Sequence, residues 1–168
     1  MAKVLERSLY QTDYYAWTRQ QAAELRRLAA ARANTTLDLA NLAEEVESLG
    51  TSQLSGVKSQ VRRVIEHLLK LEYSPGAKPR GGWRRTILEA RDEISDDLTA
   101  ALRRDAEAAL GLLYEQSRRR ARAALNEHGD RDAAKSLPAT CPYSFDQIVS
   151  HDWYPANHHG IVDHVGDV

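Results

Sequence analysis

The sequence predicts an all-α protein, and three observations lead to that prediction. Residues that favour helices, above all Ala, Leu, Arg and Glu, dominate the 168-residue chain. No run of alternating β-branched residues is present, and apolar residues recur at steps of three and four over most of its length. Each predicted helix has one apolar face, and a bundle buries all of these faces at once. We therefore expect an up-down bundle of about five main helices plus a short C-terminal helix.

The first helix is expected to begin at Thr12 or Asp13, because either side chain can cap the free N–H groups of a first turn. It should end near residues 33–35. Its predicted apolar face is formed by Tyr14, Trp17, Gln21, Leu25 and Leu28.

The next two helices are expected on either side of Gly50. Asp38 caps the second helix, and Gly50 should end it, since glycine best tolerates the left-handed conformation that closes a helix. The third helix is predicted over residues 52–73. Residues of these two helices that should be buried are Leu42, Val46, Val61, Val64 and Leu68.

A loop rich in proline and glycine is predicted over residues 74–82. The fourth helix follows from Trp83, and a break near Leu98 and Thr99 separates it from the fifth, although one bent helix fits the pattern as well. A last short helix is expected over residues 144–149, where Ser144 and a glutamine three residues later have the spacing of a capping box. In this half of the chain, the residues expected in the core are Trp83, Ile87, Ile94 and Leu113.

Composition limits the function classes. The 23 basic and 24 acidic residues nearly cancel, so charge alone does not indicate nucleic-acid binding. Cys141 is the only cysteine, which excludes an internal disulfide and fits a reducing cytosol. No window approaches about 20 apolar residues, so no membrane span is expected, and the first residues lack the apolar region of a signal peptide. We expect a cytoplasmic protein with a single domain over residues 1–155 and a flexible tail over 156–168.

Several stretches, taken in order, resemble a known family. They are DYYAW at 13–17, NLAEEVESLG at 41–50, HLLK at 67–70, WRRTI at 83–87, CPYS at 141–144 and WYP at 153–155. Together they are similar to the bacterial, largely cyanobacterial family called domain of unknown function 29. The resemblance implies an all-helical bundle from a bacterial cytosol and supplies no catalytic residues. The sequence departs from the family pattern at Ala90, where family members usually have glutamine.

A metal or acid–base site is one hypothesis for function. Glu45, Glu47 and His67 flank the apolar stripes of their helices, and carboxylates with a histidine are ligands that a helical bundle can offer to a metal. The alternative is a solvated acidic face and a boundary histidine bonded to its neighbours. We expect no cofactor and no stoichiometric metal.

Cys141, just ahead of a helix, is either a nucleophile or a buried anchor, and we favour the anchor.

A basic patch near residues 78–85 supports a second hypothesis, an accessory protein that binds nucleic acid. Its lysine and arginines surround Trp83, which could stack on a base; the alternative places Trp83 in the core, in register with Ile87. Arg84 lies in the first turn of its helix, where the helix dipole disfavours a cation, so it is a candidate for contact with an anion.

Arg120 is the remaining candidate. It lies on the same helical line as Leu113 and Ala124, so it is either a buried charge paired with an acid such as Glu45 or Glu47, or a side chain that reaches water. With no catalytic motif at diagnostic spacing, we expect a non-enzymatic helical interaction module that binds a protein partner or pairs with itself. The nucleic-acid and enzymatic readings stay open as alternatives.

Overall fold

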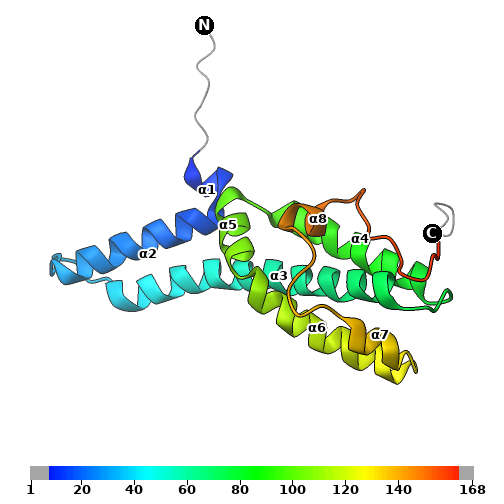
Figure 1. Ribbon diagram of the computed structural model, residues 1–168. Helices are drawn as coiled ribbons and strands as arrows, with labels where there is room; N and C mark the ends of the chain where they lie inside the picture. The colour runs from blue at the N-terminus through cyan, green and yellow to red at the C-terminus, as the bar shows by residue number, and fades with distance from the viewer. Residues whose placement is uncertain (1–7, 163–168) are drawn as a thin grey trace, which may run out of the picture. The chain divides into compact units, whose positions relative to one another are not determined.

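All regular structure is helical in the computed structural model, which describes residues 8–162 (Figure 1). Helices make up 72% of the structure, with no strands in the described part of the chain, and five of the eight helices are long. The predicted fold class is therefore confirmed. The helices are α1 (Leu9–Thr12), α2 (Tyr14–Ala30), α3 (Leu39–Tyr73), α4 (Arg80–Asp97), α5 (Ala100–Ala108), α6 (Leu110–Glu127), α7 (Arg131–Ser136) and α8 (Phe145–Val149).

The chain forms two compact units. The first, called unit 1, comprises Met1–Gly56 and Leu98–Ala106, and the second, called unit 2, comprises Val57–Asp97 and Glu107–Val168. Helix α3 contributes its first half to unit 1 and its second half to unit 2. The single domain expected over residues 1–155 stays a prediction.

In unit 1, Asp13 joins the beginnings of two helices. Its Oδ1 accepts from the backbone N–H of Ala16 at 2.9 Å, which caps α2 as predicted. Its Oδ2 accepts from the N–H of Ala101 at 3.1 Å, in the first turn of α5. The first N–H groups of a helix have no partner within the helix. The Asp13 carboxylate accepts from one such group of α2 and from one of α5.

The predicted helix end at Gly50 is wrong, because α3 runs through this position without a break. Gly50 is buried against α2 instead. A Cβ at this position would lie 2.2 Å from Oγ1 of Thr18 and 3.3 Å from Cδ2 of Tyr15. The glycine therefore permits the close approach of α2 and α3, a role that the sequence does not distinguish from a cap.

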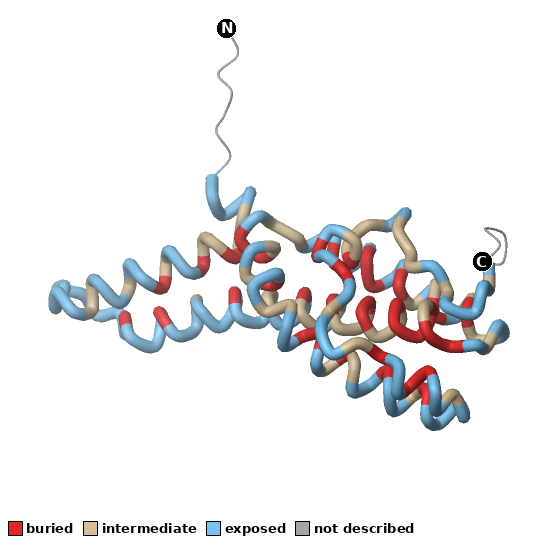
Figure 2. The backbone as a smooth tube through the Cα atoms, viewed as in Figure 1, coloured by how far each residue is buried: buried red, intermediate tan, exposed pale blue. Residues whose placement is uncertain are grey.

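The core of unit 2 is built from α3, α4, α6 and α8. Its fully buried side chains include Val61, Val64, Ile65, Leu68, Ile87, Ile94, Tyr114, Leu125, Phe145 and Ile148. Seven of the predicted core residues are buried, namely Val61, Val64, Leu68, Trp83, Ile87, Ile94 and Leu113. The two in unit 1 differ: Leu42 is 38% exposed, and Val46 is half-buried. In unit 1, the buried stretches of α2 and α3 lie where the two helices face each other (Figure 2), and α5 adds the buried residues Ala101, Leu102 and Ala106.

Helix boundaries agree with the sequence where a polar side chain marks them. The break between α4 and α5 falls at Leu98 and Thr99, as predicted. Ser144 accepts from the N–H of Gln147 and forms the predicted capping box at the start of α8. The interruption at Ala109, between α5 and α6, was not predicted, because alanine favours helix and gives no signal of a break.

Candidate functional site

The residues of the metal hypothesis are not brought together. Glu47 and His67 lie 20 residues apart on the continuous helix α3, which corresponds to about 30 Å along its axis. Glu47 forms an ion pair with Arg26 at 2.5 Å, and Glu45 is exposed. His67 is half-buried, with Nδ1 2.8 Å from the carbonyl oxygen of Arg63. Among residues 8–162, no three His, Cys, Asp or Glu side chains form a group that could hold a metal ion.

The environment of His67 fixes its protonation chemistry. A carbonyl oxygen only accepts, so Nδ1 carries the proton of the neutral ring. Burial, and next the nearby cation of Lys70, lower the pKa of His67 below its ordinary value of 6.5. The ring is therefore held in the neutral form near neutral pH.

The basic residues near 78–85 do not form one patch. Arg80 is buried and donates to the carbonyl of Leu71 at 2.7 Å. Trp83 is only 8% exposed, as predicted for a core residue, so its ring is not available to a base. The guanidinium of Arg84 lies 3.9 Å from the ring centre of Tyr154, over its face.

Arg120 does not occupy a buried line. It is exposed, because the buried stripe of α6 is rotated from the predicted one. That stripe consists of Leu113, Tyr114, Ser117, Ala121 and Leu125. Arg120 instead lines a cavity of about 360 Å³ with Arg62, Gln116 and Arg119.

Arg91 is a buried residue that the sequence analysis missed. It is fully buried, and its guanidinium donates to the carbonyls of Ile148 (2.9 Å), Gln147 (3.0 Å) and Trp153 (3.0 Å). Burial lowers its pKa from the ordinary value of 12.5. The available signal was its position on the apolar stripe of α4, four residues after Ile87.

The segment after Pro155 caps the end of α3, and the flexible tail expected over residues 156–168 stays a prediction. The amide of Asn157 donates to the carbonyls of Leu71 (2.7 Å), Glu72 (3.2 Å) and Ser74 (3.0 Å). The backbone N–H of His158 also donates to the carbonyl of Glu72, at 2.9 Å. These bonds satisfy carbonyls that a helix leaves unpaired at its C-terminus. Residues 163–168 lie outside the described part.

The aromatic and cysteine side chains near this cap have structural contacts. The hydroxyl of Tyr143 donates to Glu72 at 2.5 Å, and burial together with this bond raises the pKa of Tyr143. Burial also raises the pKa of the Cys141 thiol, whose sulfur lies 3.4 Å from the carbonyl oxygen of Tyr143. A raised thiol pKa opposes thiolate formation, so these contacts favour the anchor reading of Cys141.

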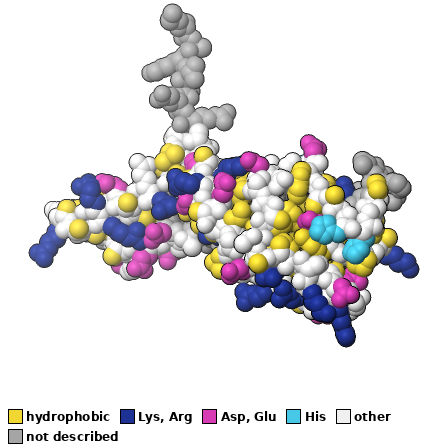
Figure 3. All heavy atoms as spheres, in the orientation of Figure 1, with side chains coloured by type: hydrophobic (Ala, Val, Ile, Leu, Met, Phe, Trp, Pro, Cys, Tyr) yellow, Lys and Arg dark blue, Asp and Glu magenta, His cyan; other side chains and the backbone are white. Residues whose placement is uncertain are grey.

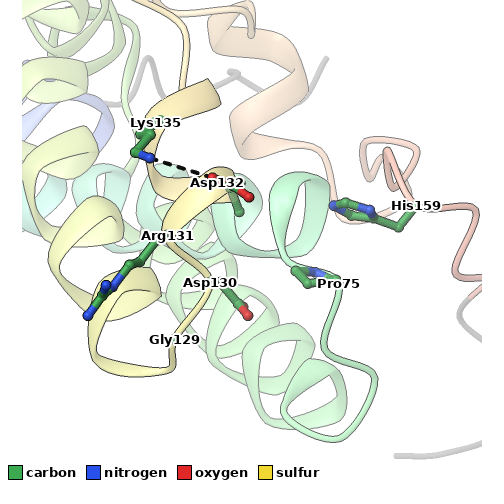
Figure 4. Close-up of a pocket in the computed structure, with 8 residues that line it drawn as sticks. Pro75, Gly129, Asp130, Arg131, Asp132, Lys135 and His159 are labelled. Carbon is green, nitrogen blue, oxygen red and sulfur yellow. Dashed lines mark ion pairs between the residues drawn. The ribbon is translucent and has the colours of Figure 1, made fainter.

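The largest of the cavities described, about 500 Å³, lies beside α7 (Figure 4). It is lined by charges of both signs. Asp132 pairs with Lys135 at 3.6 Å, Asp130 accepts from Ser74, and the side chain of Arg131 points away from His159. The charged groups therefore do not converge on one point where a ligand or substrate would sit.

Unit 1 has one polar side and one uncharged side. Successive helical side chains are about 100° apart, so α2 and α3 each have two flanks beside their shared buried line. On one side, Arg26 pairs with Glu47, and Asp105 of α5 accepts from Tyr15 and Arg19, both at 2.8 Å. The opposite flanks of the two antiparallel helices lie together on the other side.

We call this second side the uncharged face. Its seven residues include no Lys, Arg, Asp or Glu, although the exposed Glu24 and Glu45 lie at its edges, one on each helix. Leu49, at 51% exposed, and Leu42, at 38% exposed, are the most exposed of the seven. Trp17 and Tyr14 stack with ring centres 5.6 Å apart, and the 54% exposed ring of Tyr10 meets Trp17 edge-on at 4.8 Å. The uncharged face is formed by Tyr14, Trp17, Gln21, Leu28, Leu42, Val46 and Leu49.

The charges of unit 1 differ between helices α2 and α3, and those of Arg19, Arg26 and Glu47 lie on its polar side. Four of the five charged residues of α2 and the residues just after it are arginines, namely Arg19, Arg26, Arg27 and Arg32, with Glu24 as the exception. The charged residues of α3 and its cap within unit 1 are all acidic, namely Asp38, Glu44, Glu45 and Glu47. The pair thus has a basic helix and an acidic helix.

Comparisons with known proteins give a family and a fold. The family model described as "Domain of unknown function DUF29" matches residues 9–154. No curated protein matches the chain. A crystal structure of an α-helical protein of unknown function from Rhodospirillum rubrum is similar, with 27% identity and a TM-score of 0.76, over 88% of this chain and 93% of that one. In the described residues, no helix is long and apolar enough to cross a membrane.

Proposed function

This chain belongs to the DUF29 family, whose function is unknown, and we propose that it is a non-enzymatic interaction module that pairs with a second copy of itself through the uncharged face. The observation that carries the proposal is the uncharged face, with its exposed leucines and its aromatic rings and with acidic residues only at its edges. Such patches mark interaction sites when they are contiguous.

Helix α2 of unit 1 has few buried residues, which supports the proposal that a partner packs against it. The buried residues of α2 are only Tyr15, Thr18 and Ala22, so its last two turns contribute no buried side chain. Two packed helices bury only the sides that face each other, and their flanks stay exposed. A second helical pair placed on the uncharged face would complete a four-helix arrangement and bury both flanks.

Charge complementarity favours a second copy over another protein. In a two-fold interface the same surface appears on both sides. A two-fold axis that places α2 of one copy over α3 of the other brings the arginine-rich helix near the acidic one at both ends, while Arg19, Arg26 and Arg27 keep their ion pairs within unit 1. The uncharged face of each copy then covers that of the other and excludes water.

Sedimentation velocity over a range of protein concentrations tests the proposal. The wild type should dimerise, and Leu49→Glu should shift it to monomer, because a carboxylate would be buried without a partner. The matched control is Leu112→Glu on α6, where the leucine is 59% exposed in unit 2, and it should dimerise as the wild type does. Circular dichroism should show both variants folded, since both leucines are largely exposed.

Two outcomes overturn the proposal. One is a wild type that stays monomeric at all concentrations, which leaves the uncharged face for a different protein. The other is a dimer that Leu49→Glu leaves intact, which places the interface elsewhere. Rising salt should weaken the dimer modestly if the rim charges contribute.

A further inference from the structure

Three arginines and one glutamine line a cavity of about 360 Å³ in unit 2. Arg62 comes from α3, and Gln116, Arg119 and Arg120 come from α6. Lys and Arg side chains gather over α6 and α7 in the space-filling view (Figure 3). This cavity is independent of the uncharged face of unit 1.

A buried serine sets the position of these side chains. Ser117 is fully buried, and its Oγ lies 3.0 Å from the carbonyl oxygen of Arg62, so α6 packs closely on α3 at this point. Gln116, Arg119 and Arg120 are spaced by three and four residues, which places them on one face of α6. The guanidinium of Arg62 donates to Oε1 of Gln116 at 2.9 Å and is thereby oriented.

The cavity presents hydrogen-bond donors and no vacant acceptor from its polar side chains. The oxygen of Gln116 already accepts from Arg62, which leaves its NH₂ group as a donor. Arg119 and Arg120 make no hydrogen bond or ion pair with the described residues. Glu66, one turn along α3 from Arg62, is bound by Lys70 at 3.0 Å.

We infer that this cavity binds a small phosphorylated anion with two linked phosphoryl groups. Guanidinium groups match phosphate oxygens with paired, charge-assisted hydrogen bonds. Three such cations line one cavity that no carboxylate lines with them, which suits a multiply charged anion better than a singly charged one. The three arginines line one cavity of about 360 Å³, a volume that fits a small ligand, while further Lys and Arg side chains continue over α6 and α7 and make a polymer the alternative that the test includes.

Isothermal titration with inorganic pyrophosphate, at low and at moderate salt, tests this inference. The wild type should bind, and the double variant Arg119→Gln/Arg120→Gln should bind about tenfold or more weakly, because it loses two charge-assisted contacts. Arg131→Gln, which removes an exposed arginine of α7, is the control and should bind as the wild type does. Glu115→Gln should bind more tightly, because Glu115 lies one turn before Arg119 and opposes an anion there.

Titrations with further ligands show which feature of the anion the cavity binds. Adenosine diphosphate should compete with pyrophosphate if the linked phosphoryl groups are recognised. Loss of binding in Arg131→Gln equal to that in the double variant would show a diffuse basic surface and overturn the inference. So would binding of a single-stranded RNA oligomer without binding of pyrophosphate. An unchanged melting temperature of the variants without ligand confirms that they are folded, since all the substituted arginines are exposed.

Discussion

The side chain of Arg91 on α4 donates to the backbone carbonyl of Ile148 on α8 at 2.9 Å. Its other bonds, to the carbonyls of Gln147 and Trp153, make it the cap of α8 and of the turn that follows. The ring of Tyr154 lies 4.9 Å from the guanidinium and completes its surroundings. A buried cation is therefore held by carbonyl dipoles and an aromatic face, with no carboxylate among these contacts.

Arg91→Met should destabilise the protein by about 3 kcal/mol or more. The substitution keeps most of the buried volume, but it leaves the buried carbonyl of Ile148 and the part-buried carbonyls of Gln147 and Trp153 without this donor, and a buried carbonyl without a donor costs about 1 to 3 kcal/mol. Arg91→Lys should lose less, because it keeps a cation that lacks the planar fork of donors. Urea unfolding measures both values. Equal stability of Arg91→Met and the wild type would contradict the capping role.

Gly50→Ala should destabilise the protein by about 1 to 3 kcal/mol, although alanine favours helix over glycine by about 1 kcal/mol. The reason is the contact at 2.2 Å between a new Cβ and Oγ1 of Thr18. Thr18 cannot move away, because it is fully buried and its hydroxyl donates to the carbonyl of Tyr15 at 2.8 Å. Thermal melting compares the variant with the wild type.

Two further variants isolate the cause of that loss. Gly56→Ala lies on the same helix, and a Cβ there meets nothing within 4 Å. It should therefore raise stability by up to about 1 kcal/mol. Adding Thr18→Ala to Gly50→Ala should recover part of the loss, because it removes the clashing oxygen. If Gly50→Ala stabilises as Gly56→Ala does, α2 and α3 do not approach closely at Gly50.

Trp83→Ala and Arg84→Ala should differ strongly although they are neighbours. Trp83 is buried, with the ammonium of Lys70 5.6 Å from its ring centre, so its truncation should cost about 3–5 kcal/mol. Arg84 is half-buried and stacks on Tyr154, a contact worth about 0.5–1 kcal/mol. Thermal melts decide the comparison, and equal losses would make Arg84 a structural clamp.

The sequence predicts helices well because they depend on local order. Apolar spacing locates the buried stripes of unit 2, and the caps at Asp13 and Ser144 mark helix starts by a side chain next to the free N–H groups. Gly50 and Leu42 were misjudged for one shared reason. Whether glycine ends a helix or admits a neighbour, and whether an apolar stripe is covered, depends on the partner element, which local spacing does not specify.

The candidate sites depend even more on tertiary contacts. Arg62 and Arg120 are 58 positions apart, and only the packing of α6 on α3 brings them to one cavity. Helical phase matters as well: the buried stripe of α6 includes Tyr114 and Ser117, so Arg120 faces outward. Arg91 shows the reverse case, since a charge on an apolar stripe was visible in the sequence, while its carbonyl partners in α8 were not.

His67 should make stability depend on pH between about 5 and 7. Its pKa in the folded protein is lowered below 6.5, first by burial and then by the cation of Lys70. Well above pH 6.5 the ring is neutral in both states, so it adds no pH dependence there. As pH falls below 6.5, the unfolded chain binds the proton first, and stability falls, at a slope of at most about 1.4 kcal/mol per pH unit, until the folded state is also protonated.

Replacing His67 by glutamine tests this dependence, since a glutamine amide can donate to the carbonyl of Arg63 but does not titrate. The free energy of unfolding in urea is measured at pH 7.5 and at pH 5 for each protein. The wild type should lose more stability over this interval than His67→Gln, because all other titrating groups are common to both. His128→Gln, at the exposed end of α6, should lose as much as the wild type. Parallel losses in the wild type and in His67→Gln would mean that His67 takes up its proton equally well in the folded and unfolded chains, against the burial that the structure shows.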